Sequence, residues 1–195
     1  MSRRRSSRAT ALCLLAPDDL RGLATGLTAS LLGGATLECH GIFEGASLVK
    51  ALEDGAPPHL IAPGWLEPAL AESRLCGRLG STILVHPAPI RFKAKTQLKQ
   101  RVVDVVAFDE LALLARARDP AGRLALTIGD DDAQATPQDL LRVCRDEEGG
   151  IWFSGLASEV RPYARHGTPD APSLPEWRDS GFKADIFAGV VIGVS

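Results

Sequence analysis

Acidic and hydroxyl side chains follow several apolar runs of this sequence, at positions where they could contact a small ligand. The candidate ligand contacts are Asp18, Asp19, Gly45, Ala46, Ser47, Pro63 and Asp130. Ser47 carries a hydroxyl that can donate or accept a hydrogen bond, whereas ionised Asp19 and Asp130 can only accept. A ligand held between Asp19, Ser47 and Asp130 should therefore carry hydrogen-bond donors or positive charge.

Other reactive residue types lack the spacing that catalysis or metal binding needs. Cys39 and His40 are adjacent in a strand-like run, so they point to opposite faces and cannot act as nucleophile and base. The spacing matches no known metal motif for His40, His59 and His86, although a metal site formed by these three histidines stays open. The run Asp130–Asp132 is typical of a solvated acidic turn, with a divalent-cation site as the alternative. We expect binding without catalysis, and neither a metal nor a cofactor.

The composition is that of a globular protein. The 195 residues are 45% hydrophobic and 24% charged, which is enough apolar material to bury a core. The net charge of -2 provides no basic field for nucleic acid. No apolar run reaches the roughly 18 residues of a membrane span. We therefore expect neither nucleic-acid binding nor membrane insertion.

The first eight residues, Met1–Arg8, are rich in arginine and serine and predict a disordered basic leader. The alternative is the charged region of an export signal, with Ala9–Ala16 as its apolar part. Pro17 and two aspartates follow at once, which favours Ala11–Ala16 as a first buried strand. The predicted location is periplasmic if a leader has been removed or replaced, and otherwise cytoplasmic.

Short apolar runs alternate with amphipathic runs over the first 90 residues. The expected strands are Ala11–Ala16, Thr36–Phe43, His59–Ala62 and Ser81–Val85. The expected helices are one from Leu20 to Leu31, stopped by Gly33-Gly34, one over Ser47–Asp54 with Leu48, Val49 and Leu52 inward, and one over Trp65–Cys76. This order predicts right-handed crossovers and a mainly parallel sheet, whose carboxyl edge gathers the candidate ligand contacts.

The pattern changes at Pro87-Ala88-Pro89. The segment Ile90–Gln100 indicates a linker or a strand that leaves the first sheet. The next expected elements are a helix over Glu110–Ala117 and a strand over Arg123–Ile128. They are followed by a helix that starts at Thr136 and includes Leu140, Leu141 and Val143, and by a last strand over Asp185–Val194. The predicted organisation is a first α/β lobe over 9–90 and 180–195 and a second, shortened lobe over 91–179.

The stretch Glu44–Pro63 contains a Gly-Ala turn, a short helix, a Gly-Ala-Pro stop and a buried strand. It resembles the type II periplasmic substrate-binding proteins, nearest their molybdate-binding branch. Leu79–Val85 and Leu124–Asp130 resemble two later strands of that family. The resemblance implies an α/β fold like that of the type II periplasmic binding proteins, with a mainly parallel sheet and a shortened second lobe. It also implies a small molecule or ion held between two lobes, and an ABC transporter permease as partner.

The positions that align with the family's serine hydroxyls are Asp18 or Asp19 and Gly45. A carboxylate repels an oxyanion, so tight molybdate binding is not expected. We expect a solute-binding protein for another ligand. Two alternatives stay open: a cytosolic α/β enzyme acting on a small or phosphorylated substrate, and a degenerate, ligand-free sensor or interaction module.

Overall fold

The computed structural model describes residues 9–40, 45–53, 58–73, 77–92, 98, 100–118, 122, 141–155, 177–187 and 190–195. These residues belong to two compact units. The first holds the described residues of Met1–His86, Ala94–Ala107 and Leu113–Leu124, and the second those of Pro87–Lys93, Phe108–Ala112 and Ala125–Ser195. The two predicted lobes were expected to close around a ligand. The division into compact units does not test such closure, so the lobes stay a prediction.

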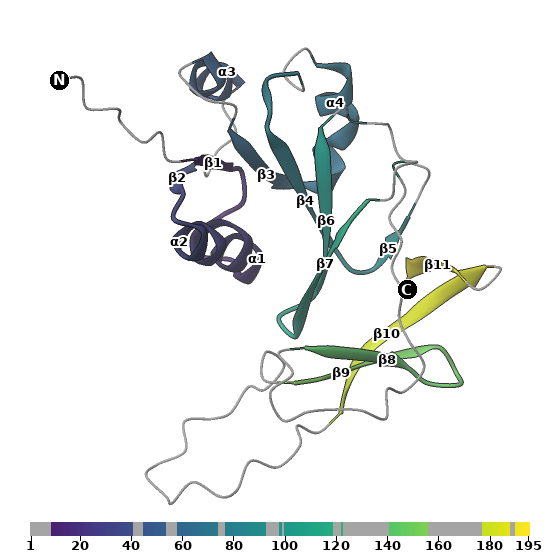
Figure 1. Cartoon of the computed structure of the whole chain (residues 1–195). Coiled ribbons are helices and arrows are strands. Elements are labelled where there is room, and N and C mark those ends of the chain that lie inside the picture. The colour runs from purple at the N-terminus through teal and green to yellow at the C-terminus, as the bar shows by residue number, and fades with distance from the viewer. Residues whose placement is uncertain are drawn as a thin grey trace, which may run out of the picture. The chain divides into compact units, whose positions relative to one another are not determined.

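A six-stranded sheet is the centre of the first unit (Figure 1). Its strands in spatial order are β2 (Thr36–Cys39), β1 (Thr10–Cys13), β3 (His59–Pro63), β4 (Ser81–Pro87), β6 (Arg101–Phe108) and β7 (Ala112–Ala117). β1 is parallel to β2 and β3, and β3 is parallel to β4. The prediction of a mainly parallel sheet is therefore confirmed, with all four strands expected in the first 90 residues.

One helix connects β1 to β2. It consists of α1 (Leu20–Gly22), a π-helical stretch η1 (Leu23–Thr28) and α2 (Ala29–Gly33). The side chain of Asp19 caps its start by accepting a 2.7 Å hydrogen bond from the backbone N of Arg21. Gly34 ends it with a left-handed φ of 66°, which glycine adopts without strain. The predicted helix and its glycine stop are confirmed.

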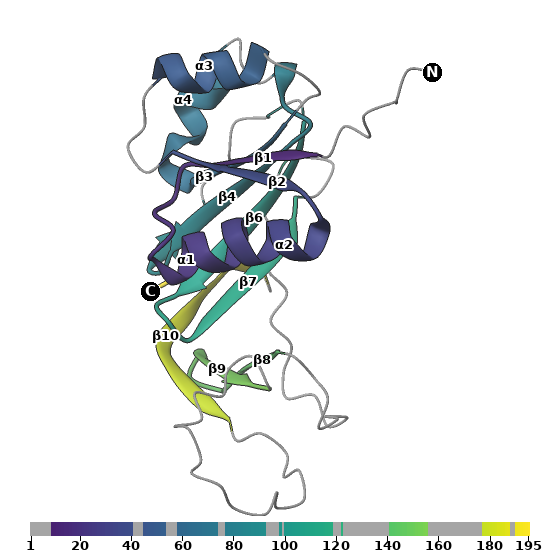
Figure 2. The same ribbon diagram turned by 90° about the vertical axis from the view of Figure 1, so that its left-hand side faces the viewer.

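Helices cover both faces of the sheet (Figure 2). α3 (Gly45–Glu53) and α4 (Glu67–Glu72), the latter preceded by a 3-10 turn η2 (Gly64–Leu66), contribute to one apolar cluster. That cluster contains Leu12, Leu48, Leu52, Leu60, Ala62, Leu70, Leu79, Leu84 and Val102. Alternate strand residues, including Cys13 beside Gly26 of η1, face the other side. Leu48 and Leu52 are buried as predicted, whereas Val49 is 37% exposed.

The second unit contains a five-stranded sheet of order β5-β11-β10-β9-β8. These strands are β5 (Ile90–Arg91), β8 (Arg142–Arg145), β9 (Gly150–Ser154), β10 (Arg178–Phe187) and β11 (Val190–Val194). Its neighbouring strands are antiparallel. The Phe108 ring contacts those of Phe153 and Phe182 edge to face, with centroids 4.9 and 5.7 Å apart. The departing strand expected in Ile90–Gln100 is β5.

Three expected elements differ from the structure. Residues of the predicted helix Glu110–Ala117 form β7, because Asp109, with a φ of 47°, turns the chain back after β6. Val143 lies in β8 and not in a helix, and Asp185–Val194 spans the end of β10 and β11. The expected elements between 123 and 139 lie outside the described residues.

The described residues form a mixed α/β fold with a mainly parallel sheet and an antiparallel sheet. A fold of the type II periplasmic binding proteins in particular is not confirmed. Among the described helices, none combines the length and the apolar character needed to cross a bilayer.

Candidate functional site

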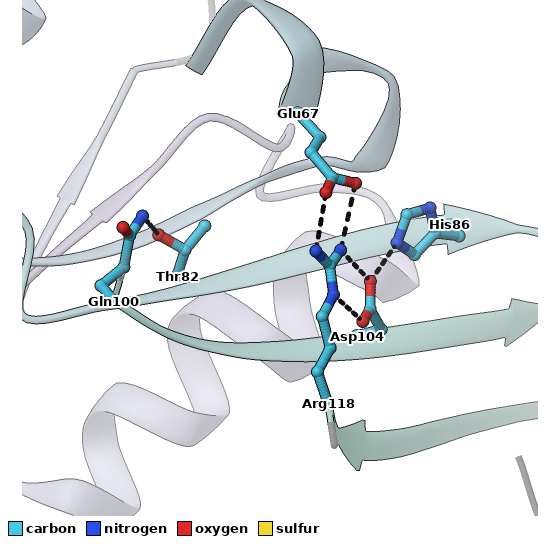
Figure 3. A network of polar contacts seen from close by, with 6 residues as sticks. All are labelled: Glu67, Thr82, His86, Gln100, Asp104 and Arg118. Atoms are coloured by element: carbon cyan, nitrogen blue, oxygen red, sulfur yellow. Dashed lines mark hydrogen bonds and ion pairs between the residues drawn. The ribbon is translucent and has the colours of Figure 1, made fainter. Parts of the chain in front are cut away.

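Four buried polar side chains form one hydrogen-bonded group, which we call the Arg118 network (Figure 3). Arg118 Nη1 and Nη2 donate to the two carboxylate oxygens of Glu67 at 2.6 and 3.0 Å. Arg118 Nε and Nη2 donate to Oδ2 and Oδ1 of Asp104 at 2.7 and 2.9 Å. Asp104 Oδ1 also lies 2.7 Å from His86 Nε2, which acts as donor because the carboxylate can only accept. One guanidinium thus bridges two carboxylates.

The strand register brings these side chains together. His86 lies near the carboxyl end of β4 and contacts Asp104 in β6, 18 residues later. Gln100 Nε2 donates to Thr82 Oγ1 at 2.9 Å, again across 18 residues. A constant separation indicates that the two segments run parallel. Leu84 lies between Thr82 and His86 on the same face and belongs to the cluster under α3 and α4.

The other two members come from the ends of neighbouring elements. Glu67 is the first residue of α4, and Arg118 directly follows β7. The backbone N of Arg118 donates to the carbonyl of Val102 at 3.2 Å, so pairing with β6 continues up to the arginine. The Arg118 network therefore ties α4 to three adjacent strands.

All four side chains are nearly inaccessible to water. Asp104 is 0% exposed, and the side chains of Glu67, His86 and Arg118 are 5–6% exposed. Burial by itself would lower the pKa of Arg118, but the hydrogen bonds to Asp104 and Glu67 outweigh it and raise that pKa above its ordinary value. Bidentate pairing of this kind is the geometry in which arginine compensates a buried carboxylate. The Arg118 network therefore serves to hold its elements together through buried, charged hydrogen bonds.

Gly64 makes room for the His86 ring. A Cβ placed on Gly64 would lie 1.9 Å from His86 Nδ1 and 2.1 Å from Cε1. Any other residue at this position would displace the ring or the backbone. The Pro63-Gly64 sequence at the end of β3 is thus coupled to the orientation of the histidine on β4.

Except for Asp130, all of the predicted ligand contacts lie at or after the carboxyl ends of parallel strands. Asp18 and Asp19 follow β1, Gly45–Ser47 form the first turn of α3 after β2, and Pro63 ends β3. Because these strands are parallel, the segments meet at one edge of the sheet, which we call the carboxyl edge. Gly45 and Ala46 are exposed there, and Asp130 lies outside the described residues. Their role in binding stays a prediction.

The carboxylate of Asp19 is already engaged. Arg21 Nε donates to its two oxygens at 2.8 and 2.9 Å, and Arg21 Nη2 forms an ion pair with it. The side-chain hydrogen bonds from Arg21 lower the pKa of Asp19 below its usual range. Asp18 is exposed in the preceding turn. Of the two negative charges attributed to this loop, Arg21 therefore offsets that of Asp19.

The sequence patterns did not reveal Glu67, Asp104 and Arg118, and they indicated His86 only as a member of a possible metal triad. One signal was present: Asp104 interrupts the apolar run Val102–Phe108. A charge inside a buried strand requires a partner, although the sequence does not say which. In the described ranges, no three His, Cys, Asp or Glu side chains are placed to hold a metal ion.

No protein-family model and no curated protein matches this chain. Solved structures of NpsA from Klebsiella oxytoca do. Its N-terminal subdomain in complex with anthranilyl-AMSN matches with a TM-score of 0.63 and 16% identity, over 98% of this chain and 54% of that one. The same subdomain with 3-hydroxybenzoyl-AMSN gives 0.63 and 16%, over 97% and 55%. NpsA-ThdA, an artificially fused adenylation–PCP di-domain NRPS, gives 0.53 and 14%, over 98% and 37%.

These matches correct the expected identity. The resemblance to type II periplasmic substrate-binding proteins and their molybdate-binding branch is wrong, as is the function of an ABC-transporter solute-binding protein. The reason is physical: a short helix, a glycine–proline stop and a buried strand recur in many parallel α/β proteins, so Glu44–Pro63 does not identify one family. The matches do not clearly favour either alternative, the small-substrate enzyme or the ligand-free module.

At 16% identity the likeness concerns the fold. This chain spans about half the length of the NpsA N-terminal subdomain structures that it matches. Over nearly its whole length, it is similar in fold to part of an adenylation-domain subdomain.

Proposed function

We propose that this chain supplies part of an adenylation-type subdomain and that its carboxyl edge contributes to a site for aromatic AMSN conjugates. One observation carries the proposal: the fold likeness extends over 97–98% of the chain to a subdomain solved with anthranilyl-AMSN and with 3-hydroxybenzoyl-AMSN. Because the chain covers only 54–55% of those structures, we propose a contribution to the site and not a complete one.

The parallel sheet supports this location. In open α/β sheets, ligands bind beyond the carboxyl ends of the strands. The loop at Asp19, the first turn of α3 at Ser47 and the end of β3 at Pro63 gather at that edge. The half-exposed guanidinium of Arg21 offsets the charge of Asp19, which reduces the repulsion that an anionic ligand would otherwise meet.

The Arg118 network supports the same edge from within the sheet. His86 lies one residue before the end of β4, and Glu67 begins the helix that follows β3. Bidentate contacts restrict both elements, and a binding surface is more effective when buried side chains hold its backbone in place. The four residues are thus proposed to position the edge without touching the ligand.

The test is a titration of the ¹⁵N-labelled chain with anthranilyl-AMSN or 3-hydroxybenzoyl-AMSN, followed by NMR. We expect the shifted amides to cluster among the non-proline residues of 14–19, at 45–47 and at Gly64. Ala46→Trp, which fills the carboxyl edge, should weaken binding at least fivefold. Glu72→Trp should not, because Glu72 ends the helix that runs away from this edge. Absence of shifts, or shifts confined to the second unit, would contradict the proposal.

A further inference from the structure

Two free cysteines lie opposite each other at one side of the six-stranded sheet. Cys13 is the last residue of β1 and Cys39 the last residue of β2, and they are register partners in this parallel pair of strands (Figure 2). Neighbouring strands lie about 4.8 Å apart, and a disulfide joins Cα atoms that lie roughly 4.4–6.8 Å apart. The backbone spacing of this pair therefore falls within the range that a disulfide accepts.

The two side chains are on the same face of the sheet. A Cβ on Gly26 of η1 would lie 2.9 Å from Cys13 Sγ and 4.0 Å from Leu37 Cδ1, so both side chains reach one point of the helix. Cys39 follows Leu37 by two residues in β2 and therefore shares its face. Burial raises the pKa of Cys13, and charge on Cys39 adds to that rise, which agrees with two sulfur atoms that lie close together.

The thiols differ in their access to solvent. Cys39 is exposed, whereas Cys13 is 1% exposed. β2 is the outermost of the described strands on its side of the sheet, so its end can move toward β1 without displacing another of them. A small approach is enough, because the Cβ atoms of a disulfide lie within about 4.5 Å, slightly less than the strand spacing. An exposed thiol next to a second, resolving thiol is typical of cysteines that respond to oxidants.

We propose that Cys13 and Cys39 form a reversible disulfide that ties the ends of β1 and β2 together. The oxidant is a low-molecular-weight disulfide such as oxidised glutathione. The Cys39 thiolate attacks one of its sulfur atoms, the S–S bond of the oxidant breaks, and one glutathione thiolate leaves. The Cys13 thiolate then attacks Cys39 Sγ of the mixed disulfide and displaces the second glutathione thiolate. The protein loses two electrons and two protons, and the oxidant gains both and becomes two glutathione thiols.

The disulfide fixes the carboxyl edge where two of its loops begin. Cys13 precedes the loop that carries Asp19, and Cys39 precedes the segment that leads to α3. The backbone N of His40 donates to the carbonyl of Cys13 at 2.8 Å, so the two chain segments stay paired up to this point. A covalent link across the pair suppresses local opening of the strand ends, which the hydrogen exchange of the His40 amide reports.

The experiment incubates the full chain with excess oxidised glutathione. We expect a product two hydrogen atoms lighter than the parent, in which mass spectrometry of peptides finds Cys13 linked to Cys39. By NMR, hydrogen exchange of the His40 amide should slow at least tenfold, and dithiothreitol should reverse both changes. Cys39→Ser, at an exposed position, should abolish both. Cys144→Ser, a matched change in β8 of the second unit, should keep both.

Three other products would overturn the proposal: a persistent glutathione adduct on Cys39, a dimer linked through Cys39, or a link from Cys39 to Cys76 or Cys144. Unreacted thiols, or a Cys13–Cys39 link with unchanged exchange at His40, would overturn it as well. The readouts on the unsubstituted chain decide the proposal even where a variant fails to fold. Since no readout involves an AMSN conjugate, the inference can fail while the proposed function stands, and the reverse.

Discussion

His86 Nε2 and Arg118 Nη2 donate to the same oxygen of Asp104, at 2.7 and 2.9 Å. One oxygen of a fully buried aspartate thus joins a histidine on β4 to an arginine that follows β7. The second side of the guanidinium binds Glu67 at the start of α4. Loss of this one cation should affect every element that the Arg118 network holds.

Arg118→Met should destabilise the protein by about 3–5 kcal/mol, because it leaves two buried carboxylates without their counter-charge. Urea unfolding followed by circular dichroism measures the change. The control is Arg116→Met, two residues earlier, in β7, whose guanidinium donates to the neighbouring carbonyl of Ala115; its loss should change the stability by less than about 0.5 kcal/mol. A loss below about 1 kcal/mol for Arg118→Met would mean that the Arg118 network is not formed in solution.

Gly64→Ala should destabilise by about 2–3 kcal/mol, since its Cβ would overlap the His86 ring at 1.9 Å. Gly33→Ala is the opposite case. Gly33 lies in α2 with no atom within 4 Å of an added Cβ, so alanine should stabilise by about 0.5–1 kcal/mol through helix propensity. Thermal unfolding of both variants tests the pair, and equal effects would contradict the close packing of Gly64 against His86.

Asp19→Ala should cost about 0.5–1 kcal/mol at neutral pH, through loss of the helix cap. The folded-state pKa of Asp19 is lowered by its hydrogen bonds with Arg21, so its contribution is complete above the unfolded value of about 4 and is lost as pH falls through the folded value. The gap in stability between Asp19→Ala and the parent should therefore narrow as the pH falls below about 4 and close below the folded-state pKa of Asp19. Asp18→Ala, at the exposed neighbouring position, keeps the cap and should match the parent at neutral pH. A gap for Asp19→Ala that does not narrow below about pH 4 would rule out this linkage.

Cys39 should react with iodoacetamide at least tenfold faster than Cys13 in the folded protein. Cys39 is exposed, whereas Cys13 is 1% exposed and burial raises its pKa, which lowers its thiolate fraction. Peptide mass spectrometry after timed labelling separates the two sites. In urea the rates should become similar, and similar rates without urea would show that β1 is not the buried strand described.

The parallel half of the fold could be read from the sequence because each element there is marked locally. The run Ala11–Ala16 is apolar, Gly33-Gly34 stops a helix, and Pro57-Pro58 prevents another from continuing. The β6–β7 hairpin could not be predicted from the sequence. Glu110–Ala117 contains good helix formers, and only its pairing with β6 makes it a strand.

The candidate site was predictable at its edge but not at its centre. Asp19 and Pro63 follow apolar runs, so their common edge follows from strand order. Glu67 and Arg118 are 51 residues apart in the chain, and nothing local links them. The predicted family was wrong for a related reason: the local pattern in Glu44–Pro63 is shared by many parallel α/β proteins.

The span of the Arg118 network has a consequence for protein synthesis. Glu67, His86 and Asp104 emerge from the ribosome before the cation that compensates them. A nascent chain that ends before Arg118 would have to bury two carboxylates without it, which is costly enough to keep α4 and β6 from docking. The first unit should therefore complete its packing only after Arg118 has been translated and released, and until then its nascent strands remain substrates for chaperones.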